Sequence, residues 1–92
     1  MEHELFIFTQ EEMALDVSKA TRAVREAKFV EALRLLKMNL AEDPNHIDSL
    51  YLSAVSSRYL KNFDDSKKFI ERLLTNAPDM GRAYQELGHL NR

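Results

Sequence analysis

Cysteine is absent from this 92-residue chain, and glycine and proline occur only twice each. Without cysteine the chain can form neither a disulfide bond nor a thiolate metal site, and it lacks a cysteine nucleophile. This absence fits a reducing compartment, so we expect the protein in the cytoplasm. Because glycine and proline break helices, their scarcity favours long helices. The length allows one small domain.

The chain also lacks an excess of basic residues and a long apolar run. Its net charge of −2 provides no positive surface for a nucleic acid. No apolar run approaches the ~18 residues that a membrane span requires. A secretory signal needs a basic start and a longer apolar stretch than Leu5, Phe6, Ile7 and Phe8, which follow two glutamates. We therefore expect neither a nucleic acid nor a membrane among the partners.

Helical spacing is present along five segments, where apolar residues recur every three or four positions. The helices are predicted at residues 9–24, 29–41, 47–60, 63–74 and 80–90. Four residues of the last helix are expected to face inward: Ala83, Tyr84, Leu87 and Leu90. No segment shows sustained period-two alternation, so the predicted fold is all-α.

The predicted helix ends follow from capping residues and prolines. Thr9 and Glu12 form a capping box at the start of the first helix. Pro44 and Pro78 stop the second and fourth helices, because proline cannot continue a helix. Asn62 is the expected N-cap of the fourth helix.

Pro44 and Pro78 are 34 positions apart, which is the period of a repeat made of two antiparallel helices. Other residues follow the same period: Phe29 with Phe63, Ala20 with Ala54 and Gly88, Ala32 with Ser66, Leu36 with Ile70, and Leu40 with Leu74. Small residues in the middle of a helix allow close approach, and large apolar residues fill the space on either side. One hairpin cannot bury its apolar face alone, so neighbouring hairpins must stack.

The segment FVEAL at residues 29–33, followed by DPN at 43–45, and the segment GRAYQELG at 81–88 resemble the tetratricopeptide repeat. The resemblance covers residues 13–92 and implies an α-solenoid of five helices in antiparallel hairpins. Repeats are expected at residues 9–44 and 45–78. Residues 79–92 are a closing helix, equivalent to the first helix of a third repeat, and residues 1–8 are an apolar arm. The closing helix either caps the array or belongs to a longer protein. We favour the second interpretation.

Some residues depart from the repeat pattern. Lys19 and Ser53 stand where the family usually has a large apolar residue, Asp16 where a bulky one is expected, and Asn39 at a usually small site. These departures leave the register and packing of the first repeat open. The segments SLYLSAV at 49–55, RYL at 58–60 and RAYQELG at 82–88 also resemble the repeat region before a sulfotransferase domain in some bacterial proteins. The phosphosulfate-binding loop is absent, so this piece would carry none of that chemistry.

In such hairpins the first helices line a concave surface, which the resemblance implies as the site for a peptide or protein partner. The candidate partner-binding residues are Val17, Thr21, Tyr51, Leu52, Val55, Arg58, Tyr59, Arg82, Gln85 and His89. Tyrosine and arginine commonly anchor interfaces, and exposed apolar patches tend to bind partners. The alternative is that the apolar members pack against residues 5–8, a second copy or a further helix. We expect no clamp for acidic C-terminal peptides, because Val17, Thr21 and Leu52 occupy positions that need polar donors, and Glu86 opposes Arg82.

Leu5, Phe6, Ile7 and Phe8 are expected to be covered, because burial of each is worth roughly 1.5–3 kcal/mol. A homodimer through this arm or through the closing helix is one possible cover. We expect no catalytic, cofactor or metal site, since the three histidines lack zinc-ligand spacing and nothing assembles a nucleophile with a base. The leading hypothesis is therefore a non-enzymatic protein–protein interaction module. The alternatives are a non-catalytic repeat segment of a larger enzyme, such as a bacterial sulfotransferase, and a self-associating adaptor.

Overall fold

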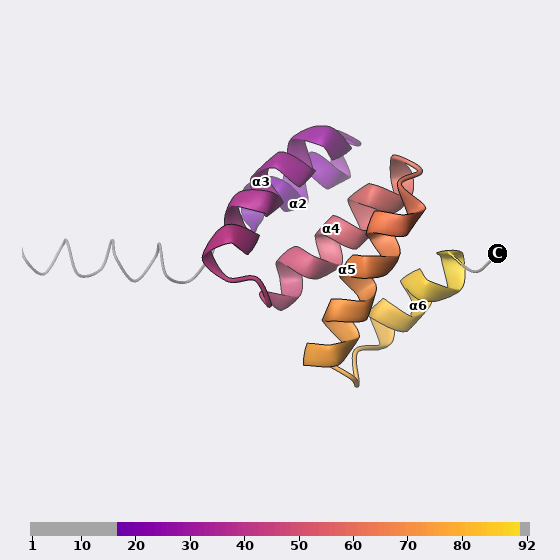
Figure 1. The fold of residues 1–92 in the computed structure, drawn as a ribbon. Coiled ribbons are helices and arrows are strands. Elements are labelled where there is room, and N and C mark those ends of the chain that lie inside the picture. Colours follow the sequence, from indigo (N-terminus) through magenta and orange to yellow (C-terminus); the bar gives the residue numbers. More distant parts are fainter. Residues whose placement is uncertain (1–16, 91–92) are drawn as a thin grey trace, which may run out of the picture.

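The computed structural model describes residues 17–90, which form five α-helices and, within that range, no strand (Figure 1). The helices are α2 (Ser18–Arg25), α3 (Phe29–Glu42), α4 (Ile47–Tyr59), α5 (Phe63–Asn76) and α6 (Gly81–Leu90). The all-α prediction is confirmed, and α3 to α6 begin and end within two residues of their predicted limits. The capping box at Thr9 and the apolar arm lie outside the described residues.

The helices pack as a stack of hairpins rather than around a common centre. Each helix contacts the next along the chain; α2 also contacts α4, and α4 also contacts α6. Within residues 17–90, the backbones of α3 and α5 do not approach each other. We call α2, α4 and α6 the inner layer and α3 and α5 the outer layer (Figure 1). This arrangement is the one expected when similar hairpins stack side by side.

The 34-residue period is also present in the backbone of the hairpin turns. Ala27 and Lys61 follow α2 and α4 at φ angles of 61° and 66°, in the left-handed region. In both turns the amide of the next residue donates to the carbonyl five positions back, at 2.8 Å. The left-handed residue itself donates to the carbonyl three positions back, at 3.0 and 2.9 Å. This is the Schellman arrangement, repeated at positions 34 apart although neither residue is glycine.

The turns between hairpins repeat as well. Asp43 and Ala77 follow α3 and α5 with φ angles of −138° and −141°. Each accepts a hydrogen bond at its carbonyl from the amide three positions later, at 3.1 and 3.2 Å. Asn62 precedes α5 as predicted, but its side chain makes no capping hydrogen bond.

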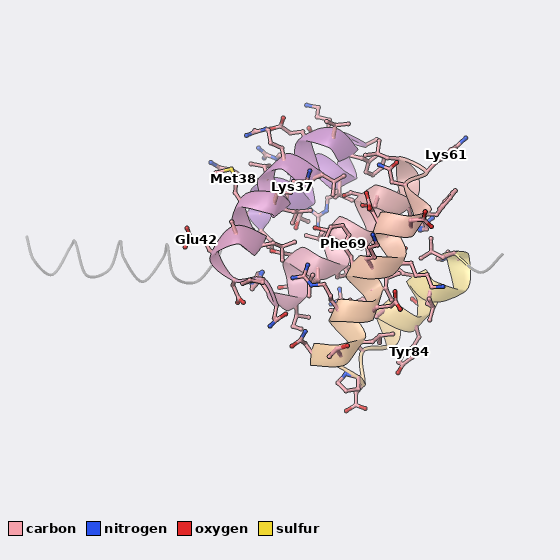
Figure 2. The ribbon with its side chains drawn as sticks, viewed as in Figure 1. Lys37, Met38, Glu42, Lys61, Phe69 and Tyr84 are labelled. Carbon is pink, nitrogen blue, oxygen red and sulfur yellow. The ribbon has the colours of Figure 1, made fainter. Side chains whose placement is uncertain are left out.

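Glycine at position 61 is expected to stabilise the protein. A side chain in the left-handed region costs about 1–2 kcal/mol, and glycine avoids that cost, while the greater freedom of glycine in the unfolded chain offsets part of the gain. We expect Lys61→Gly to raise the free energy of unfolding by roughly 0.5–1 kcal/mol in urea titrations. Lys61 extends from the α4–α5 turn (Figure 2), so the loss of its side chain removes little packing.

The matched control is Lys67→Gly, an exposed position inside α5. There glycine only weakens the helix and should lower the free energy of unfolding by about 1 kcal/mol. A loss of stability in both variants would contradict the left-handed turn.

Small residues lie where helices meet, as predicted. Ala20, Ala32, Ala54 and Ser66 are all within 1% of complete burial, and the Ser66 hydroxyl donates to the carbonyl of Ala54 at 2.7 Å. Among the large residues beside them, Leu36 and Ile70 are fully buried, whereas Leu40 and Leu74 are half-buried. Gly88, the third member of the Ala20 series, instead has open space where a side chain would begin. The reason is that no described helix covers α6 on that side.

The same reason explains one wrong prediction. Tyr84 was expected to face inward, yet its side chain is 53% exposed and points away from the helices (Figure 2). Its equivalent 34 positions earlier, Leu50, is fully buried in a cluster with Ile70 and Leu73 of α5. α6 has no such following helix in the described part of the chain, and the Tyr84 hydroxyl donates to the carbonyl of Pro78 at 3.0 Å.

No helix in residues 17–90 has the length and apolar character needed to cross a membrane.

Candidate functional site

The ten candidate residues all belong to the inner layer or directly precede it. Arg82, Gln85, His89 and Tyr59 are exposed; Val17, Thr21, Tyr51, Leu52 and Arg58 are half-buried; Val55 is buried. Because α4 contacts both α2 and α6, residues up to 72 positions apart in the sequence share one layer.

An ion pair joins the last two inner helices. The Arg58 Nε donates to one carboxylate oxygen of Glu86 at 2.6 Å, and its Nη2 donates to the other at 3.3 Å. Glu86 is only 6% exposed, although α6 is the last described helix. Hydrogen bonding to Glu86 raises the pKa of Arg58 above its ordinary value. Two hydrogen bonds between a guanidinium and a carboxylate set the relative orientation of both side chains and are stronger than bonds between neutral groups. The pair therefore holds α6 in register on α4.

Two tyrosines of α4 are held by neighbours from other helices. The ring of Tyr59 stacks on Phe29 of α3, with centroids 4.7 Å apart and planes 2° apart. The Arg58 guanidinium lies 4.5 Å from the centre of the same ring. Tyr51 packs against the core cluster, and the guanidinium of Arg82 lies 4.7 Å from its ring centre. Held in this way, the tyrosines present fixed surfaces, which lowers the entropy cost of binding.

Leu52 and Val55 take little part in the exposed surface. Leu52 packs against a cluster of Ala20, Ala23, Ala32 and Leu36, and so joins α4 to the first hairpin. Val55 is 8% exposed. Of the ten candidate residues, those that a partner can reach are therefore mainly Tyr59 and the α6 residues Arg82, Gln85 and His89.

The structure also gathers a set of residues that sequence analysis did not connect. A groove of about 720 Å³ lies between α2 and α3. Its charged lining consists of Lys19, Arg22, Arg25, Lys28 and Arg34, with Glu26 and Glu31. We call it the basic groove. The available signal was the local excess of five cations over two carboxylates in a chain of net charge −2.

A second missed feature is the serine-rich face of α4. Ser53 and Ser56 are 1% and 0% exposed, and neither hydroxyl has a hydrogen-bond partner within residues 17–90. The sequence pattern marks Ser53 only as a departure from the repeat. Buried hydroxyls without partners destabilise a fold.

Metal chemistry receives no support from the geometry. Among the described residues, no three His, Asp or Glu side chains come together in a way that could hold an ion.

Comparison with known proteins does not place the chain in a family. No family model, curated protein or solved structure matches it. The tetratricopeptide resemblance therefore stays a hypothesis, supported by the 34-residue period in residue types and in turn geometry. The partner-binding surface is likewise a prediction, argued from the layer that the inner helices form.

Proposed function

We propose that this protein is a non-enzymatic protein–protein interaction module of the tetratricopeptide type, located in the cytoplasm. It binds a peptide or protein partner along the inner layer. The observation that supports this proposal is the contact of α2 with α4 and of α4 with α6, while α3 and α5 stay apart. Exposed side chains from helices distant in sequence thereby share one surface, and that surface carries the tyrosine and arginine that often anchor interfaces.

The rigidity of the surface favours the same function. Tyr59 is 55% exposed although it stacks on Phe29 and lies beside the Arg58 guanidinium, so it reaches solvent while its position is fixed. The ion pair between Arg58 and Glu86 holds α6 beside it. A partner that contacts Tyr59 and α6 together meets a surface that is already ordered.

The test is affinity capture from a lysate of the source cells, followed by direct titration of the protein captured. The variant Arg82→Ala/Gln85→Ala/His89→Ala removes three exposed side chains of α6. We expect it to weaken partner binding by at least about tenfold, since truncating an anchor residue costs 1 kcal/mol or more.

The matched control is Lys67→Ala/Lys68→Ala/Glu71→Ala, three exposed positions on α5 in the outer layer. This variant is expected to bind as the unchanged protein does. Equal binding by both triple variants would rule out the inner layer as the site.

Self-association is the second candidate function. Phe63 is 52% and Tyr84 53% exposed, at the end of the stack formed by α5 and α6. Exposed aromatic residues are enriched in protein interfaces. A constant monomer mass in light scattering up to high protein concentration would remove this candidate.

A further inference from the structure

The basic groove lies on α2 at positions that correspond, 34 residues earlier in the sequence, to the face of α4 on which α3 packs. Three contacts define that face of α4. The side-chain amide nitrogen of Asn39 lies 3.4 Å from the hydroxyl oxygen of Ser49. Leu52 packs against the cluster that contains Leu36, and Tyr59 stacks on Phe29. All three partners belong to α3. This face of α4 is therefore a seat for a helix.

Ser53 and Ser56 lie on the same face of α4, since residues three and four apart share one side of a helix. Both are buried. Their equivalents 34 positions earlier are Lys19 and Arg22 of α2, and the equivalent of Tyr59 is Arg25. These three cations are exposed and line the basic groove. The first hairpin thus offers the same seat, with positive charge in place of small and aromatic residues.

The remaining lining fits this comparison. The apolar lining of the groove is the half-buried Leu35, with the buried Ala23 beside it. Both carboxylates already have cationic neighbours, because Glu26 lies 3.1 Å from Lys28 and Glu31 pairs with Arg34. Hydrogen bonding to Arg34 lowers the pKa of Glu31, which stays ionised and engaged. Lys19, Arg22 and Arg25 are left without a carboxylate partner among the described residues.

We infer that the basic groove is a docking site for an acidic amphipathic helix of a partner protein, seated on α2 and α3 as α3 is seated on α4. Its apolar side contacts Ala23 and Leu35, and its carboxylates face Lys19, Arg22 and Arg25. This site uses residues of α2 and α3 that are not among the candidate residues of the inner layer, and it does not depend on the proposed function. The helix C-terminus favours nearby cations, which accounts for Arg22 and Arg25 but not for Lys19.

A nucleic acid is a poorer occupant. The protein as a whole carries a charge of −2, which disfavours a long polyanion. The groove has a volume of about 720 Å³ and corresponds in position to the face of α4 on which α3 packs, which favours a helix as its occupant.

The probe is a fluorescein-labelled 14-residue peptide that copies α3 with two changes, Arg34→Glu and Lys37→Glu, and its binding to the full chain is followed by anisotropy. A second peptide has every charged residue replaced by Gln. We expect the acidic peptide to bind at least about tenfold more tightly than the neutral one. The affinity should fall as salt rises from 50 to about 500 mM, because exposed charges are screened.

Two charge-reversal variants of the protein separate the groove from net charge. Lys19→Glu/Arg22→Glu is expected to weaken binding of the acidic peptide by at least about tenfold. Lys37→Glu/Lys67→Glu makes the same change in net charge at exposed positions outside the groove, and should bind within about threefold of the unchanged protein. The milder Lys19→Gln/Arg22→Gln, which adds no repulsion, should fall between them.

Three results would overturn the inference. The first is equal loss in the two charge-reversal variants. The second is tighter binding of a 14-nucleotide single strand than of the acidic peptide at 150 mM salt. The third concerns the five acidic residues of positions 1–16: Glu2, Glu4, Glu11, Glu12 and Asp16. If the peptide binds only after these are replaced by glutamine or asparagine, the groove serves the chain's own acidic segment instead of a partner.

Discussion

Replacement of Arg58 by methionine is expected to lower the free energy of unfolding by about 2–3 kcal/mol. The change leaves the carboxylate of Glu86, which is 6% exposed, without its partner. Removing one partner of a buried ion pair lowers the free energy of unfolding by about 3–5 kcal/mol. The Arg58 side chain is 21% exposed, so water screens part of the interaction and the expected loss falls at or just below the bottom of that range. Urea titration followed by circular dichroism measures the effect.

The double variant Arg58→Met/Glu86→Leu is the control that isolates the unpaired charge. With both charges removed, apolar contact between α4 and α6 replaces the ion pair, which is often neutral or stabilising. We therefore expect the double variant to recover most of the stability lost by Arg58→Met. If Arg58→Met alone stays within about 0.5 kcal/mol of the unchanged protein, the pair does not hold α6 on α4.

The second large effect has the opposite sign. Ser53→Ala/Ser56→Ala should raise the free energy of unfolding by roughly 2 kcal/mol, because each substitution removes a buried hydroxyl without a partner. Alanine also favours the helical backbone by a few tenths of a kcal/mol over serine. The midpoint of thermal unfolding should rise by about 8 °C or more, since 1 kcal/mol corresponds to 4–8 °C in a domain of this size.

Ser66→Ala is the matched control, since Ser66 is also fully buried but donates to the carbonyl of Ala54 at 2.7 Å. Loss of this hydrogen bond should lower the free energy of unfolding by about 1 kcal/mol. The same chemical change thus has opposite effects at two kinds of site in one core. A loss of stability in the Ser53/Ser56 variant would mean that those hydroxyls do have partners.

Local signals made the helices predictable. Pro44 and Pro78 mark the ends of two helices, because proline cannot continue a helix. The apolar residues on either side of these prolines recur only at the helical spacing of three or four positions. These two signals located α3 to α6 to within two residues. The hairpin turns were harder, because Ala27 and Lys61 adopt the left-handed conformation that sequence analysis associates with glycine. Their agreement across 34 positions is visible only in the backbone.

The candidate surface depended on tertiary contacts, which the sequence pattern does not contain. Arg58 and Glu86 are 28 positions apart on different helices, so their pairing followed from the way α6 sits on α4. Tyr84 was misplaced because its equivalent Leu50 is buried by a helix that has no counterpart beyond α6 in the described residues. The basic groove was missed because its cations come from two helices and a turn.

Methyl-resolved nuclear Overhauser spectroscopy of the full chain tests the stacked arrangement most directly. The account predicts cross-peaks between the methyl groups of Leu52 on α4 and those of the first-hairpin cluster against which it packs, which consists of Ala20, Ala23, Ala32 and Leu36. It also predicts no cross-peaks between backbone amides of α3 and α5, whose backbones stay apart. Amide contacts between α3 and α5 together with loss of the contacts between Leu52 and that cluster would instead indicate a closed bundle, with no shared inner layer for a partner.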